Sequence, residues 1–179
     1  WQAEGKDYYV SINVSGRQIP DGISPAMLAG IVRRYGISPA RLVLEITEGV
    51  LMSDVSQALS WLNAVRDQGF RIYLDDFGTG YSSLSYLKRF PVTTVKIDKS
   101  FVRDMSRDSS DLALVGAIIA MAHSLSLEVV AEGVENIAQL QLLRQKHCRN
   151  IQGYYFSKPV LPEEFDATAE RIHGLLGSI

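Results

Sequence analysis

The chain has 179 residues, of which 46% are hydrophobic and 21% charged, and its formal net charge is -2. These values are typical of a globular protein, so we expect one domain over residues 1–179. The near-neutral charge argues against a nucleic-acid partner, because a duplex binder presents a strongly basic face. No apolar run reaches the ~18 residues of a membrane-spanning helix, so we expect no membrane contact by this segment. The single cysteine, Cys148, excludes an intrachain disulfide.

Short apolar stretches rich in Val, Ile and Tyr alternate along the chain with amphipathic stretches. The apolar stretches predict strands at 8–14, 42–47, 70–74, 94–97, 127–131 and 150–156. Because they mostly lack polar–apolar alternation, they are typical of parallel strands that are buried on both faces. Helix caps and glycine stops predict helices at about 24–36, 54–69, 82–90, 111–125 and 136–147, and a last helix from 162 onward.

This alternation predicts right-handed βαβ units and hence an α/β fold. The segment that follows the first strand, at 13–17, lacks the glycine spacing of a dinucleotide-binding fingerprint, which weakens an open doubly wound sheet. Polar clusters follow strand after strand, which favours a (β/α)8 TIM-like barrel with its strand ends at one mouth. Six strands cannot close such a barrel, so we expect about six of its eight βα units, an N-terminal truncation and apolar surface exposed beside the gap.

Polar and acidic side chains gather at the predicted C-terminal strand ends. Carboxylates come from four different strands, and so many like charges are costly to bury together unless cations neutralise them. Oxygen ligands favour hard ions, so we expect Mg2+ or Mn2+, and two adjacent aspartates could serve two ions. A lysine among the acids could orient water or stabilise phosphate charge. The residues are Asn13, Glu45, Glu48, Asp75, Asp76, Lys96, Asp98, Glu132, Glu135 and Gln152.

Each of these residues also has a structural interpretation. The paired aspartates could form a turn with a helix cap, and the buried glutamate and lysine of the strands could pair for the sake of the fold. Asn13 could be a turn residue, and Glu48 and Glu135 could cap the helices that follow them. The coincidence of acids at four separate strand ends favours a metal site over these single-residue explanations.

Several segments, taken in order, resemble the EAL domain, a bacterial phosphodiesterase family that cleaves cyclic-di-GMP to linear pGpG. One such motif would be weak evidence, whereas the whole ordered series makes the resemblance specific. The segments are SINVS at 11–15, LEITE at 44–48, DDFGTGYSSL at 75–84, VKID at 95–98, AEGVE at 131–135 and QGYYFSKP at 152–159.

The resemblance implies a two-metal site with cyclic-di-GMP as substrate and two Mg2+ or Mn2+ ions as cofactors. Asn13, Glu45 and Asp75 would bind one metal ion. Asp75 and Asp76 would share in binding the second ion, with Glu132 near it. These assignments come from the matched motifs and not from the spacing of the residues.

The same resemblance implies catalytic and supporting roles for further residues. Lys96 would act on the attacking water, and Glu132, Glu135 and Gln152 would support the water and the phosphate. Glu48 would anchor the loop at 76–84, which in the family links the metal site to a homodimer interface.

The chain departs from the family pattern because no Glu-Ala-Leu triplet occurs in it. The family's triplet supplies a metal ligand on an earlier strand, so we expect that segment upstream and expect the fragment alone to be inactive. The departure keeps open a receptor that binds cyclic-di-GMP without cleaving it. A metal-dependent barrel lyase would also fit the acids and the lysine, but it would not explain the loop at 75–84.

The resemblance finally implies a setting for the domain. We expect a homodimer, fused in its parent protein to sensory or GGDEF domains. We also expect a cytoplasmic location, which could be the cytoplasmic part of a membrane-anchored protein.

Overall fold

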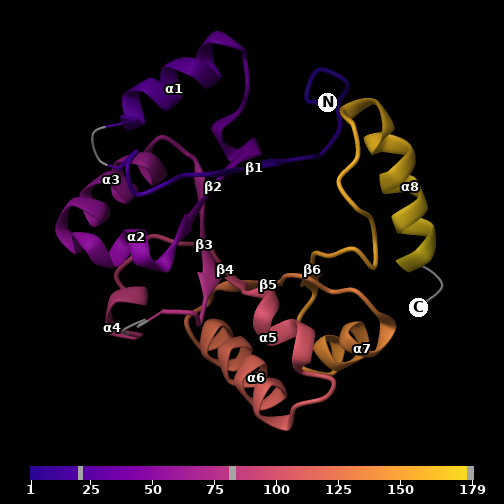
Figure 1. Cartoon of the computed structure of the whole chain (residues 1–179). Helices are drawn as coiled ribbons and strands as arrows, with labels where there is room; N and C mark the ends of the chain where they lie inside the picture. The colour runs from indigo at the N-terminus through magenta and orange to yellow at the C-terminus, as the bar shows by residue number, and fades with distance from the viewer. Residues whose placement is uncertain (20–21, 81–83, 177–179) are drawn as a thin grey trace.

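A parallel sheet curled into a half-barrel forms the centre of the computed structural model, which describes residues 1–19, 22–80 and 84–176 (Figure 1). Each strand pairs in parallel with the next one along the chain. This unbroken order is that of a (β/α)8 barrel, so the predicted fold class is confirmed, with six strands present. The strands are β1 (Val10–Asn13), β2 (Leu42–Thr47), β3 (Arg71–Phe77), β4 (Thr94–Ile97), β5 (Glu128–Ala131) and β6 (Asn150–Ile151).

Helices on the outside of the curled sheet connect the strands (Figure 1). Ser24, Asp54 and Asn136 begin three of them by accepting hydrogen bonds from backbone N–H groups of the first turn. The helices are α1 (Pro25–Arg34), α2 (Glu48–Ser53), α3 (Val55–Asp67), α4 (Leu84–Leu87), α5 (Lys99–Asp104), α6 (Ser109–Ser124), α7 (Ile137–Gln145) and α8 (Phe165–Leu176), with 3-10 turns at Pro39–Arg41 and Pro162–Glu164.

The structure corrects several predicted bounds, because β1 is Val10–Asn13 and not 8–14, and β3 is Arg71–Phe77 and not 70–74. The prediction of a strand at 150–156 is too long, because β6 ends at Ile151 and the chain then turns. Gly153 crosses the backbone of Val134 so closely that a Cβ would lie 2.1 Å from the Val134 oxygen. The short helices α2 and α5 were not predicted. The predicted helix start at 82–83 and the motif residues 81–83 lie outside the described residues.

The core lies between the outer face of the sheet and the helices. Because strand residues alternate in direction, the intervening residues Glu45, Tyr73 and Lys96 face the inside of the half-barrel. The fold therefore gives the sheet an apolar outer face and a polar inner face near the strand ends. Apolar residues of β2, β3 and β4 in the buried cluster include Leu44, Ile46, Ile72, Leu74, Val95 and Ile97.

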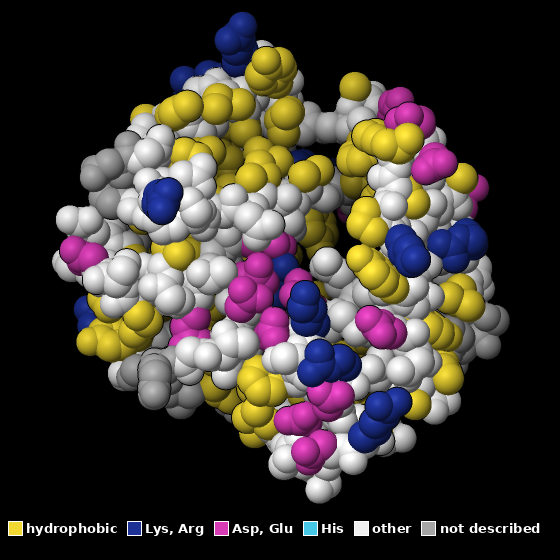
Figure 2. Space-filling model, viewed as in Figure 1, with side chains coloured by type: hydrophobic (Ala, Val, Ile, Leu, Met, Phe, Trp, Pro, Cys, Tyr) yellow, Lys and Arg dark blue, Asp and Glu magenta, His cyan; other side chains and the backbone are white. Residues whose placement is uncertain are grey.

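The two edge strands, β1 and β6, border an opening in the half-barrel. All four residues of β1 are exposed, including the apolar Val10 and Ile12. An open cavity of about 770 Å³ lies beside β6, and its lining includes Tyr9 and Ile172 of α8. Figure 2 shows a hollow between these parts of the molecule. The exposed apolar surface predicted beside the gap is therefore present. No helix in the described part of the chain is long and apolar enough to cross a membrane.

The crossing at Gly153 predicts a specific loss of stability. Gly153→Ala should lower the free energy of unfolding by roughly 1–3 kcal/mol or more, because the added methyl group overlaps the Val134 backbone. Gly30→Ala is the matched control, since nothing lies within 4 Å of a Cβ at that position in α1, and it should raise stability by about 0.5–1 kcal/mol. Urea unfolding measures both changes, and wild-type stability of Gly153→Ala would show that the crossing can relax.

Candidate active site

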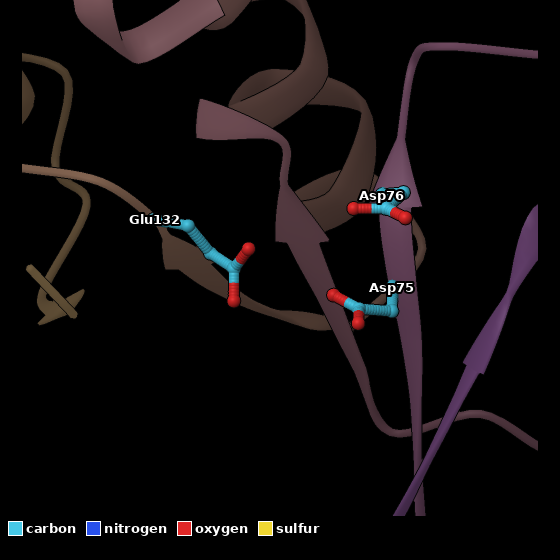
Figure 3. A group of neighbouring side chains, drawn as sticks. All are labelled: Asp75, Asp76 and Glu132. Atoms are coloured by element: carbon cyan, nitrogen blue, oxygen red, sulfur yellow. The ribbon is translucent and has the colours of Figure 1, made fainter. Parts of the chain in front are cut away.

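An irregularity at the end of β3 brings two adjacent aspartates onto one side of the sheet. In a regular strand, Asp75 and Asp76 would point to opposite faces. The pairing of β3 with β4 shifts between Leu74 and Phe77, and Asp76 has a left-handed backbone with φ of 52°. Bulges of this kind re-aim side chains and are frequent beside active sites. Asp75, Asp76 and Glu132 consequently offer carboxylate oxygens that lie within 4.8 Å of one another (Figure 3).

Lys96 of β4 contacts carboxylates that come from three other strand ends. Its Nζ lies 2.8 Å from Glu45 Oε2, 3.1 Å from Asp75 Oδ1 and 2.7 Å from Glu132 Oε1. Lys96 is 4% exposed and Glu45 is 8% exposed, so water screens these charges little. Burial by itself lowers the pKa of Lys96, but its hydrogen bonds to Glu132 and Glu45 outweigh burial and raise the pKa. The side chain is therefore a protonated ammonium.

Negative charge exceeds positive charge in this cluster. Burial raises the pKa of Glu132, and the hydrogen bond from Lys96 opposes that rise only in part. Burial and the neighbouring Asp75 also raise the pKa of Asp76. Asp75 Oδ1 is buried and accepts no hydrogen bond from any described residue, although Lys96 Nζ lies within ion-pair distance. Surplus carboxylate oxygens with an unsatisfied acceptor fit a divalent cation such as Mg2+ or Mn2+.

Asp98, directly after β4, is a neighbour of the site to which the sequence analysis assigned no role. Its carboxylate accepts a hydrogen bond from Ser100 N at 2.9 Å and lies beside the Asp76 carboxyl group. Burial alone would raise the pKa of Asp98, but the hydrogen bonds from Ser100 outweigh burial and lower the pKa. The sequence signal that could have placed Asp98 beside the site is strand alternation, which puts Asp98 on the same side of the sheet as Lys96.

Three further predicted residues lie around this cluster. Asn13 ends β1, where its Cα is in register with that of Glu45 on β2. Gln152 follows β6, and its backbone N–H donates to Ala131 O at 2.9 Å. Glu135 lies directly before the Asn136 cap of α7. The side chains of Asn13, Gln152 and Glu135 are exposed, and their roles in the site stay predictions.

Glu48 lies beneath the motif loop at 75–84. It begins α2 and is 5% exposed, and neither of its carboxylate oxygens has a hydrogen-bond partner among the described residues. A Cβ at Gly80 would come within 3.0 Å of Glu48 Oε1, so the carboxylate packs directly against the loop backbone. Glu48 therefore lies where a residue that anchors this loop would have to lie.

Comparison with known proteins identifies the family. The EAL domain family matches residues 1–159, so the chain belongs to that family. The cyclic di-GMP phosphodiesterase NbdA of Pseudomonas aeruginosa is 47% identical over 129 residues, which are 72% of this chain and 16% of NbdA. The chain spans 16% to 26% of the length of such curated relatives.

Solved structures of EAL proteins are similar to this half-barrel. The PaMucR phosphodiesterase in complex with c-di-GMP superposes with a TM-score of 0.89 and is 37% identical, over 92% of this chain and 67% of that chain. BlrP1 of Klebsiella pneumoniae, solved with manganese and c-di-GMP, has a TM-score of 0.78 and is 32% identical, over 88% of this chain and 41% of that chain.

The ion cluster predicts a pH-dependent loss of stability on removal of Lys96. Lys96→Met should lower the free energy of unfolding by about 3–5 kcal/mol near pH 8, because the buried carboxylates lose their cation. The pKa of Glu132, already raised by burial, then rises further above its unfolded value. Protonation below this pKa relieves the repulsion, so the loss should shrink as the pH falls toward about 5.

Urea unfolding at the two pH values measures this effect. The control is Lys88→Met, at an exposed position outside the cluster. A loss of the same size at both pH values would contradict the electrostatic explanation.

Proposed function

We propose that this chain is the catalytic domain of a phosphodiesterase that hydrolyses cyclic-di-GMP to linear pGpG with the help of two divalent ions. The observation that carries the proposal is the convergence of carboxylates from three strand ends on Lys96 in a chain of the EAL family. NbdA is named a cyclic di-GMP phosphodiesterase, and PaMucR was solved with c-di-GMP, which supports the same substrate here.

The donor set supports two ions. The bulge in β3 places Asp75 and Asp76 side by side, where Asp75 would be a ligand of both ions and Asp76 a ligand of the second. Glu132 lies within reach of both aspartates, and Glu45 and Asn13 complete the proposed ligands. One BlrP1 structure holds manganese and another holds calcium, each with c-di-GMP. We propose Mg2+ or Mn2+, which would neutralise phosphate charge and acidify a water molecule.

The side chains of this chain would position the reactants. Lys96, held by carboxylates on several sides, would direct its ammonium at the attacking water and stabilise the charge that develops on the phosphate. Glu48 would hold the loop that carries Asp76, and Glu135 and Gln152 would support the water and phosphate from the rim. Burial of Lys96 and Glu45 would strengthen these electrostatic contacts, because water is largely excluded there.

The alternative function is a receptor that binds cyclic-di-GMP without cleaving it, which stays open because no Glu-Ala-Leu triplet occurs in these 179 residues. Hydrolysis of cyclic-di-GMP by the full-length protein with added Mg2+ tests the two candidates. Formation of pGpG supports the phosphodiesterase, and binding without product supports the receptor.

We further propose a homodimer, a cytoplasmic location and a parent protein with additional sensory or GGDEF domains.

Asp75→Asn should abolish hydrolysis, lowering kcat by at least about 100-fold, because an amide is a poor bridge between two cations. The matched control is Asp67→Asn, since Asp67 is an exposed aspartate that pairs with Arg66 on α3. Steady-state formation of pGpG measures the effect in the full-length protein. Retention of most of the rate by Asp75→Asn would refute the two-ion assignment.

Lys96→Ala should lower kcat by about 100-fold or more while the Kd for cyclic-di-GMP changes by less than about tenfold. The reason is that a group acting on the attacking water stabilises the transition state more than the bound substrate. Single-turnover kinetics and calorimetric binding measure the two quantities at a temperature where circular dichroism shows folded protein. Loss of affinity with an intact kcat would instead make Lys96 a phosphate holder.

A further inference from the structure

Gln139 of α7 is a buried polar side chain to which the proposed mechanism gives no role. It is 2% exposed, and its amide is hydrogen-bonded at both ends. Its Oε1 accepts from Glu135 N at 2.8 Å and from Asn136 N at 3.2 Å, and its Nε2 donates to Arg103 O at 3.1 Å. A buried amide is costly unless it is satisfied in this way, so the contacts fix the side chain in one position.

These hydrogen bonds hold residues 135 and 136, at the end of the turn that begins with Glu132. Part of the arrangement is a capping box with Asn136, which by itself would only begin α7. The bond to Arg103 is different, because it reaches 36 residues back along the chain to α5. Helix α5 directly follows β4, the strand of Lys96. Gln139 therefore connects the segment after Lys96 with the turn after Glu132.

Close backbone packing leaves this turn little freedom on its other sides. Gly133 has φ of 70°, and a Cβ there would lie 2.6 Å from the Lys99 Cβ at the start of α5. Val134 packs against Gly153, where a Cβ would lie 2.1 Å from the Val134 oxygen. Glu132 N donates to Ile97 O at 3.2 Å, which ties the same turn to the end of β4.

We propose that Gln139 is a positioning residue that keeps Glu132 in contact with Lys96 and thereby sets the geometry of the metal site. The catalytic consequence rests on the proposed function, whereas the positioning concerns only the turn, Glu132 and Lys96. Gln139 acts through the 132–136 turn and through α5, and not by contact with substrate. Hydrogen-bonding partners behind metal ligands typically change metal affinity or activity by 10–100-fold when they are lost.

Two substitutions separate the cross-link from the helix cap. Gln139→Met keeps the volume and removes every polar contact of the side chain. At a pH where its carboxyl group is ionised, which is the pH used for the comparison, Gln139→Glu keeps oxygen acceptors for Glu135 N and Asn136 N but loses the donor to Arg103 O. Gln141→Met is the control for the same change at an exposed position of α7, and Leu142→Ala removes apolar core contacts of a half-buried side chain of the same helix.

The experiment measures Mn2+ affinity by titration, and kcat and KM for cyclic-di-GMP, in the full-length variants. Gln139→Met should lower Mn2+ affinity and kcat by about 10–100-fold with KM changed only a few-fold, and Gln139→Glu should fall between it and the wild type. Gln141→Met should match the wild type. Leu142→Ala should retain Mn2+ affinity even where its thermal stability falls as much as that of Gln139→Met.

Two results would overturn the proposal. Equal losses of Mn2+ affinity in Gln139→Met and Leu142→Ala would leave Gln139 a general structural residue. Wild-type behaviour of Gln139→Glu would show that the capping box suffices and that the link to Arg103 has no part. If the wild type fails to cleave cyclic-di-GMP, the proposed function fails. Hydrogen exchange of the backbone amides of Glu132 and Gly133 then still tests whether Gln139 holds the turn. Exchange should be faster in Gln139→Met and unchanged in Leu142→Ala.

Discussion

The contact of one buried ammonium with three carboxylates determines how β2, β3, β4 and β5 meet at their C-terminal ends. Lys96 offsets part of the negative charge of Glu45, Asp75 and Glu132, which would otherwise repel one another more strongly in a place that water screens little. Buried ion pairs of this kind are often no more stabilising than apolar residues of the same volume. The cluster is therefore poorly explained as a source of stability alone, and its surplus negative charge agrees with the metal site that we propose.

Rigid backbone features hold the charged groups in this arrangement. The left-handed conformation of Asp76 is strained for an aspartate, and such strain persists only where the surroundings impose it. Here the left-handed residue coincides with the register shift between β3 and β4. On the opposite side of the cluster, Gly133 and Gly153 allow backbone approaches that no side chain would permit. Backbone geometry thus sets the positions of the acidic groups on both sides of the site, and side-chain hydrogen bonds complete the arrangement.

Local pattern predicted much of this fold, because the strands are short apolar runs bounded by turn residues. The bounds of β2 and β4 were predicted as observed, and so was the convergence of acids at successive strand ends. The length of β6 was wrong, because the packing of Gly153 against Val134 is a tertiary contact that apolar composition cannot reveal. Strand alternation would also have put Asp75 and Asp76 on opposite faces, and only the bulge shows that they share one. The reach of Gln139 to Arg103 lies beyond any local pattern for the same reason.

The proposed residues differ in how many neighbouring strands hold them, and this difference separates them into two groups. Glu45, Asp75, Lys96 and Glu132 lie on or directly after interior strands, where neighbouring strands and helices fix them from both sides. Asn13 and Gln152 lie at the two edge strands, and β1 is paired with β2 alone and exposed along its whole length. The interior group can keep its geometry by its own contacts. Asn13 and Gln152 have strand neighbours on one side only among the described residues, so their positions are less constrained than those of the charged groups at the centre.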